Sequence, residues 1–357
     1  MSGAAREDAA GPRQPVESRR PVPPAVARLV PFDPPRWLAN RHFQSILPSL
    51  PLRRPAMRRR AAGLLEASRE LVVDCGGDVR LLAFHASPGV AGDGPPARGA
   101  VVLHHGWEGS AESLYILSLG QALLEAGFEV FRLNLRDHGS SHHLNPGLFH
   151  SCRIAEVVGA VARIGQLTGG RPLSLVGFSL GGNFALRVGA RARAAGIALR
   201  RIVAVCPVLD PAVTLDALER GPALYREYFL LKWRRSLRRK QAAWPDLYDF
   251  TALAGERSLT SMTARMVAEH TDFPGLAAYL AGYAITGEAL APLETPSRII
   301  TALDDPMIPP RELDALKRVP ALEVTVTRRG GHCGFVERFG RAGAWIDREV
   351  LAELTRP

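Results

Sequence analysis

The chain has 357 residues, of which 46% are hydrophobic and 22% are charged, an ordinary balance for a folded globular protein. Its formal net charge is +10, but residues 1–60 alone hold twelve arginines and four acidic residues, so the other 297 residues carry a net charge of only +2. A nearly neutral body without basic motifs interleaved with aromatic residues excludes a nucleic-acid-binding core, and we expect no nucleic-acid partner.

The N-terminal stretch, residues 1–36, is rich in proline, arginine and small residues. This composition predicts a disordered tail or a strap that lies on the surface. Acidic residues and prolines interrupt any apolar run in it, so it does not resemble a secretory signal, and no segment of the chain approaches the roughly 18 apolar residues of a membrane span. We therefore expect a cytoplasmic protein.

The four cysteines, Cys75, Cys152, Cys206 and Cys333, are far apart in the sequence and form no C-x-x-C pair. This spacing favours free thiols in a reducing compartment over a disulfide framework or a zinc site. The histidines between residues 138 and 150 also lack spaced carboxylate partners, and we expect neither a metal nor another cofactor.

From about residue 70 onward, short apolar runs alternate with helical patterns. This alternation predicts an α/β fold with a mostly parallel eight-stranded sheet and helices on both faces. We expect antiparallel pairing only between the first two strands, because their connection is too short for a crossover helix. The expected strands are residues 71–73, 80–84, 100–103, 130–135, 173–176, 202–206, 298–302 and 322–326.

About 90 residues between the sixth and seventh expected strands show helical patterns and no clear strand. We interpret residues 207–292 as a helical cap inserted into a core made of residues 37–206 and 293–357, where it would exclude water and shape a pocket. Its residues 232–240 hold six cations within nine positions. They form either a solvated helix face or a patch that makes weak peripheral contact with an anionic membrane.

Residues 175–183 read LVGFSLGGN and place Ser179 between Gly177 and Gly181, after an apolar strand signal and before a helix with an apolar stripe. A Gly-x-Ser-x-Gly pattern at a strand-to-helix turn is typical of a nucleophile elbow, where the strained backbone leaves no room for flanking side chains. The alternative is an ordinary glycine-rich turn. The remaining parts of a catalytic site decide between the two.

Two backbone N–H groups are candidates for an oxyanion hole. One belongs to Leu180, the residue after the expected nucleophile, and the other to Trp107, in the loop that follows the expected strand 100–103. Donors at these two positions stabilise the negative charge that develops on the substrate oxygen during acyl transfer.

The catalytic acid is expected after the strand 298–302, where the chain offers Asp304 and Asp305. We favour Asp305, because it stands at the end of the strand and is followed by a turn that packs back through Ile308. Asp304 fits a turn-capping or supporting role instead.

The catalytic base is expected after the last strand, where His332 lies on a glycine-rich loop. Its imidazole would take the proton of Ser179 through one ring nitrogen while Asp305 holds the N–H of the other. The chain order of serine, aspartate and histidine is that of α/β hydrolases, and together these features favour a nucleophilic serine.

Beyond this general plan, the sequence resembles the YheT-like hydrolases. The matching segments are NRHFQSILP at 40–48, HGWEGS at 105–110, LFHS at 148–151, GFSLGGN at 177–183, ALDDP at 302–306 and GGHCGF at 330–335. In that family the serine, second aspartate and histidine of these motifs form the triad, which implies Ser179, Asp305 and His332 here. The tryptophan at position 107 departs from the smaller apolar residue usual in the family.

These observations predict a serine hydrolase that cleaves carboxylic esters through an acyl-serine intermediate. The resemblance implies short- or medium-chain acyl esters, and the basic cap segment extends the range to lipid esters. An acyltransferase with the same triad and a catalytically silent scaffold that binds a ligand or partner remain alternatives. The sequence does not indicate an oligomeric state.

Overall fold

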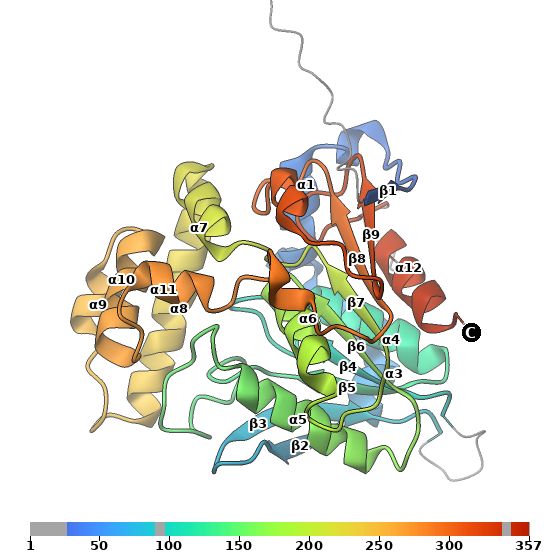
Figure 1. Cartoon of the computed structure of the whole chain (residues 1–357), viewed down its shortest axis with the longest axis horizontal. Coiled ribbons are helices and arrows are strands. Elements are labelled where there is room, and N and C mark those ends of the chain that lie inside the picture. The colour runs from blue at the N-terminus through green and yellow to red at the C-terminus, as the bar shows by residue number, and fades with distance from the viewer. Residues whose placement is uncertain (1–26, 90–96, 338–343, 357) are drawn as a thin grey trace, which may run out of the picture.

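The computed structural model describes residues 27–89, 97–337 and 344–356 (Figure 1). Most of the predicted tail, residues 1–26, lies outside these ranges. The described residues form a mixed nine-stranded sheet with helices on both faces, which confirms the predicted α/β-hydrolase architecture.

The strand order of the sheet is β1-β9-β8-β7-β6-β4-β5-β3-β2, and the pairing is parallel except where β3 takes part. β3 runs antiparallel to both β2 and β5, whereas antiparallel pairing was expected only between β2 and β3. The central strands are buried along their whole length because helices cover both faces. The strands are β1 (Ala27–Leu29), β2 (Arg69–Asp74), β3 (Arg80–Ala86), β4 (Ala100–His104), β5 (Glu129–Leu133), β6 (Leu173–Phe178), β7 (Leu199–Val205), β8 (Ser297–Ala302) and β9 (Leu322–Thr327).

The prediction of eight strands was one short, because β1 lies within the expected N-terminal tail. It pairs in parallel with β9, with Leu29 opposite Val326. Two of its three side chains are exposed, so no alternation of polar and apolar residues marks it in the sequence. The segment becomes a strand because its backbone pairs with the N–H and carbonyl groups of β9.

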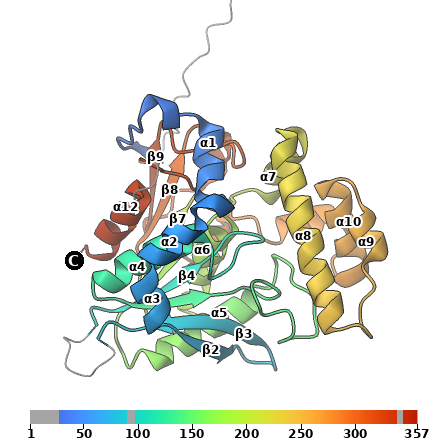
Figure 2. The ribbon, with the colours of Figure 1, turned by 180° about the vertical axis from the view of Figure 1, so that it is seen from behind.

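Different helices cover the two faces of the sheet (Figures 1 and 2). α5 and α6 contribute to one apolar core, and α3, α4 and α12 contribute to the other. α1 and α2 precede α3 and lie along the same side as α4. The bounds are α1 (Arg41–Ile46), α2 (Arg54–Arg60), α3 (Ala62–Ala67), α4 (Leu114–Glu125), α5 (Ile154–Leu167), α6 (Leu180–Ala192) and α12 (Trp345–Leu354), with short 3-10 turns at Arg36–Leu38, Leu47–Ser49 and Pro51–Arg53.

The interval between β7 and β8 is helical, as expected, and its helices gather to one side of the sheet (Figures 1 and 2). The division of the chain into a core and a separate cap stays a prediction. The helices are α7 (Pro211–Arg220), α8 (Ala223–Ala243), α9 (Thr251–Gly255), α10 (Leu259–His270) and α11 (Leu276–Ala281), followed by a 3-10 turn at Glu288–Leu290.

Some of the six cations in residues 232–240 of α8 make intramolecular contacts. Lys240 is fully buried, and its Nζ donates to Oδ1 of Asp137 at 2.8 Å. Lys232 donates to the carbonyl oxygen of Glu108 at 2.6 Å. The interpretation of the whole stretch as a solvated face is therefore wrong, and these contacts instead attach α8 to loops at the end of the sheet. Across the described ranges, no helix is both long enough and apolar enough to span a membrane.

Candidate active site

Ser179 occupies a strained turn between β6 and α6. Its backbone has φ 53° and ψ −121°, a region that non-glycine residues rarely adopt, and it caps the N-terminus of α6. A Cβ atom on Gly177 would lie 2.1 Å from the carbonyl oxygen of Gly181, and one on Gly181 would lie 2.4 Å from that of His104. Only glycine fits at either position, so the turn has the tight geometry of a nucleophile elbow.

The loop after β4 lies directly against this turn. A Cβ atom on Gly106 would come within 3.2 Å of the Cβ of Ser179. The hydroxyl of Tyr115 accepts the N–H of Gly106 at 3.0 Å and fixes the loop from behind. Within the described part of the chain, the N–H of Trp107 makes no hydrogen bond, and the N–H of Leu180 has no intrahelical partner because Leu180 begins α6. Both predicted oxyanion donors are therefore available.

Asp305 and His332 are paired. Oδ2 of Asp305 lies 2.8 Å from Nδ1 of His332, and Oδ1 accepts the N–H groups of Met307 at 2.8 Å and Ile308 at 2.9 Å. Because a carboxylate only accepts hydrogen bonds, Nδ1 is the nitrogen that donates to Asp305, and in the neutral imidazole the lone pair is then on Nε2. The turn through Ile308 thus orients the carboxylate as the sequence suggested.

Asp304 contacts the backbone of the loop and not the imidazole of His332. Its Oδ1 accepts the N–H of Gly331 at 2.8 Å. This contact anchors the start of the loop that follows β9 and carries His332, residues 328–336, called here the histidine loop. Burial raises the pKa of Asp304 to about 6. The structure therefore places Asp305, and not Asp304, against the imidazole.

The serine and the histidine are less closely joined than the histidine and the aspartate. Among the described residues, no hydrogen bond links the hydroxyl of Ser179 to His332. The Nε2 atom instead has the Sγ atom of Cys333 at 3.8 Å. Burial raises the pKa of the Cys333 thiol well above its ordinary value, so this sulfur is a neutral thiol.

Helix α1 holds the histidine loop, a role that the sequence reasoning missed. Oγ of Ser45 accepts the N–H of His332 at 2.9 Å. Oε1 of Gln44 accepts the N–H of Val336 at 2.8 Å, and its Nε2 donates to the carbonyl of Val336 at 2.9 Å. Gln44 is fully buried. A polar pair within the NRHFQSILP segment was the available signal, but nothing local indicates a partner almost 300 residues away.

Helix α8, from the helical interval between β7 and β8, contacts both the loop that carries Trp107 and helix α1. The ring of Trp107 stacks on Phe229 with centroids 5.1 Å apart and meets Trp233 edge-on at 5.3 Å. The hydroxyl of Tyr225 and Nδ1 of His42 are 2.8 Å apart, which ties α8 to α1. Apolar aromatic surface therefore borders the loop that carries one of the candidate oxyanion donors.

Two of the cysteines are in contact, and His138, one of the histidines between residues 138 and 150, makes a structural hydrogen bond. Although Cys206 and Cys333 are far apart in the chain, the N–H of Cys333 donates to the Sγ of Cys206 at 3.3 Å. Sequence spacing did not indicate this contact, and all four cysteines are free thiols, as the spacing favoured. His138 has an internal role, because its Nε2 accepts the N–H of Glu108 at 3.2 Å and burial lowers its pKa to about 4.

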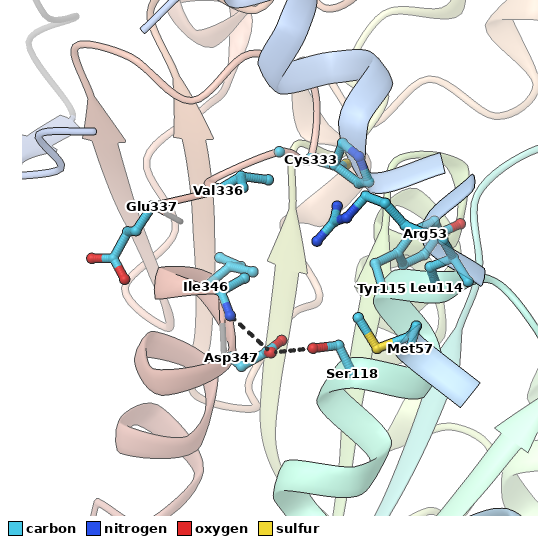
Figure 3. A pocket seen from close by; sticks show the side chains of 13 residues that line it. Arg53, Met57, Leu114, Tyr115, Ser118, Cys333, Val336, Glu337, Ile346 and Asp347 are labelled. Atoms are coloured by element: carbon cyan, nitrogen blue, oxygen red, sulfur yellow. Dashed lines mark hydrogen bonds between the residues drawn. The ribbon is translucent and has the colours of Figure 1, made fainter. Parts of the chain in front are cut away.

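A cavity of about 40 Å³ lies behind the histidine loop, between α2, α4 and α12 (Figure 3). Cys333 lines it on one side, and Arg53 and Met57 line it on another. Ser118 donates to Oδ2 of Asp347 at 2.6 Å at its base, and burial raises the pKa of Asp347 to about 6. Neither Ser179 nor His332 lines this cavity.

Comparison with known proteins places the chain in a family. A family model described as the alpha/beta hydrolase fold matches residues 99–339. The chain belongs to this α/β-hydrolase family. A putative esterase, YheT, from Escherichia coli (strain K12) is 25% identical to this α/β hydrolase over 315 residues, which cover 85% of the present chain and 87% of YheT. The resemblance that the motifs predicted is therefore confirmed at the level of the α/β-hydrolase family, with YheT as a distant relative.

Solved structures agree with this fold. An esterase from Pyrococcus furiosus superposes with a TM-score of 0.52 at 15% identity, covering 81% of the α/β hydrolase and 90% of the esterase. A serine hydrolase from Cycloclasticus zankles superposes with a TM-score of 0.50 at 18% identity, covering 81% and 96% of the two chains. At such low identity these similarities show the fold alone.

Proposed function

We propose that this α/β hydrolase cleaves carboxylic esters through an acyl-serine intermediate, with Ser179 as nucleophile, His332 as general base and Asp305 as its orienting acid. The observation that carries the proposal is the 2.8 Å contact between Asp305 and His332, on a loop beside a serine held at φ 53°. The contact leaves the lone pair of the imidazole on Nε2, the nitrogen that must take the serine proton.

The first half of the reaction acylates the serine. Nε2 of His332 takes the hydroxyl proton as the Ser179 oxygen attacks the ester carbonyl, and the N–H groups of Trp107 and Leu180 stabilise the oxyanion. The tetrahedral intermediate collapses when the C–O bond to the alcohol breaks, and the imidazolium gives its proton to the departing alkoxide. The serine hydroxyl must rotate toward Nε2 as substrate binds, a tightening that is common once the reactive complex forms.

The second half releases the acid. His332 removes a proton from water, the water oxygen attacks the acyl carbon, and collapse of the second intermediate returns the proton to Ser179. Every step uses side-chain and backbone groups of this chain together with water. The carboxylate of Asp305 stabilises the imidazolium in both halves.

The aromatic residues of α8 suggest the substrate class. We propose that residues 207–292 act as a cap and that Trp107, Phe229 and Trp233 present apolar surface to the acyl chain. Such a surface favours uncharged acyl groups over charged ones, because burying a charged group without a partner is costly. The short to medium chain length is what the resemblance to the YheT-like hydrolases implies.

The test is hydrolysis of p-nitrophenyl esters of increasing acyl length by the wild type and by Ser179→Ala. We expect a chain-length optimum in the wild type and loss of turnover in the variant, with exposed Ser49→Ala as the matched control that keeps full activity. A wild type that is folded but hydrolyses no ester would contradict the proposal and favour a silent scaffold. If added alcohols capture the acyl group faster than water does, the enzyme is an acyltransferase.

A further inference from the structure

Two cysteines and the proposed general base form a compact cluster at the ends of β7 and β9. Cys206 directly follows β7, and Cys333 directly follows His332. The two Sγ atoms and a ring nitrogen of His332 all lie within 4.8 Å of one another. In the described ranges, no other three histidine, cysteine or acidic side chains bring their ligand atoms together in this way.

The distances suit a tetrahedral cation. With Zn–S bonds of about 2.3 Å and Zn–N bonds of about 2.0 Å, neighbouring ligand atoms in a zinc site are roughly 3.5 to 3.8 Å apart. Sγ of Cys333 and Nε2 of His332 are already 3.8 Å apart. The remaining pairs lie within 4.8 Å and need to close by about 1.3 Å at most, which a change in the χ1 angle of one thiol side chain supplies.

The chemistry of the ligands selects a thiophilic cation. Both cysteines are free and both are buried, Cys206 completely. A divalent cation compensates two thiolates, so the loaded cluster carries no net charge in this apolar setting. Asp305 adds the carboxylate behind the histidine that commonly orients a metal-binding imidazole and raises its basicity.

We propose that Cys206, Cys333 and Nε2 of His332 bind a thiophilic divalent cation such as Zn²⁺, and that the bound cation inhibits this hydrolase. The two thiol protons pass to the solvent as the metal–sulfur bonds form, and no electrons are transferred. The Nε2 lone pair that would take the serine proton is then shared with the cation. The binding half of the proposal stands alone, and the inhibition half rests on the proposed esterase function.

The cavity behind the histidine loop offers the cation a route. Cys333 lines it, and Asp347 supplies a carboxyl group at its base (Figure 3). Arg53 also lines it, whereas the carboxylate of Glu337 is paired with Arg348. Displacement of Cys333 toward the cavity also provides room for a fourth ligand such as water.

Binding is measured first, on the full chain carrying Ser179→Ala, after chelator treatment and with a phosphine reductant present throughout. Addition of Co²⁺ should produce thiolate-to-cobalt charge-transfer absorption in the near ultraviolet and the visible bands of a tetrahedral site, both abolished by Zn²⁺. Adding Cys206→Ser should remove the charge-transfer absorption or weaken it greatly, while adding Cys75→Ser, the matched half-buried thiol, should leave it unchanged. Absence of thiolate absorption in the parent would overturn the site, and this result needs no cysteine variant to fold.

Inhibition is measured second, as the Zn²⁺ concentration that halves ester hydrolysis relative to each protein's own metal-free rate. Cys206→Ser should raise this concentration about tenfold or more, as expected when a site loses a ligand, and Cys75→Ser should not. A chelator should restore activity and the phosphine should not; the reverse pattern would indicate a Cys206–Cys333 disulfide and contradict the proposal. A cobalt-binding chain that Zn²⁺ fails to inhibit overturns the inhibition half. A chain that binds cobalt but hydrolyses no ester refutes the proposed function instead.

Discussion

The histidine loop and helix α8 both border the candidate active site, but different contacts hold them. The side chain of Gln44 forms buried hydrogen bonds with the backbone of Val336 at one end of the loop, and Oγ of Ser45 accepts the N–H of His332 nearer the other. At its active-site end, α8 meets the core through the stacked rings of Trp107, Phe229 and Trp233 and through hydrogen bonds of Tyr225 and Lys232, and its buried ion pair lies further along the helix at Lys240. Hydrogen bonds fix a reacting atom closely, whereas stacked rings tolerate small shifts. We therefore expect the proposed base to be held more rigidly than the proposed acyl-binding surface.

Replacement of Asp305 should have the largest effect, because it removes the orienting partner from the rigid side. Asp305→Asn should lower kcat roughly 10⁴-fold with little change in KM, as when a triad histidine takes the wrong tautomer. Asp304→Asn keeps an oxygen for the N–H of Gly331 and is the matched control, so its loss should be under about tenfold. Steady-state kinetics decide, and an equal loss in both variants would contradict the assignment of the acid.

Removal of the ion pair should destabilise the attachment of α8. Lys240→Met leaves the buried carboxylate of Asp137 without its cation, which should lower the free energy of unfolding by about 3–5 kcal/mol. Exposed Arg235→Met on the same helix should change it by less than about 0.5 kcal/mol. Denaturant unfolding at pH 8 measures both. Equal stabilities would mean that the pair does not hold the helix.

Removal of the two hydrogen bonds between Gln44 and Val336, the Gln44 clamp, should lower kcat without changing KM. Gln44→Ala leaves the buried N–H and carbonyl of Val336 unpaired, which should cost about 1–3 kcal/mol of stability. We also expect kcat to fall while KM for short esters stays constant, because the loop that carries the base loosens and the acyl surface does not. Exposed Gln166→Ala serves as control. An increase in KM with constant kcat would assign Gln44 to the substrate side instead.

The last prediction concerns the pH dependence of stability at the start of the helical interval between β7 and β8. Oε2 of Glu312 accepts the N–H of Asp210, the N-cap residue of α7, at 2.8 Å, and burial raises the pKa of Glu312 to about 8. The folded protein therefore binds this proton more tightly than the unfolded chain, whose glutamate titrates near 4.5. The resulting destabilisation is complete above pH 8 and disappears as the pH falls toward 4.5.

Glu312→Gln should accordingly be more stable than the wild type at pH 8, with a difference that shrinks toward pH 5. Thermal unfolding of both proteins across this range measures it. The control is Glu323→Gln, an exposed carboxylate for which the difference should be small at every pH. A Glu312→Gln difference that grows as the pH falls would have the wrong sign for this account.

Local patterns in the sequence were enough to predict most of the fold and the elbow. Alternating strand and helix signals predicted the sheet. The positions of Ser179, Asp305 and His332 after expected strands then predicted that these three residues belong to one site. These inferences succeed because parallel strands place their carboxyl ends at one edge of a sheet.

The contacts that local patterns could not reveal join distant segments. β1 depends on the free edge of β9, the Gln44 clamp spans 292 residues, and the two thiols meet across 127 residues. The burial of Lys240 was missed for the same reason, since its partners lie on another loop. Periodicity describes which face of an element is buried, but not which side chain it will meet.

The central claim is that Ser179 becomes acylated, and site-resolved labelling tests it most directly. The wild-type chain would be treated with a fluorophosphonate, which reacts with activated serines, and peptide mass spectrometry would locate the adduct. We expect a single adduct on Ser179 that disappears in His332→Ala, although the serine is still present. An adduct on another serine, or no adduct on folded protein, would contradict it.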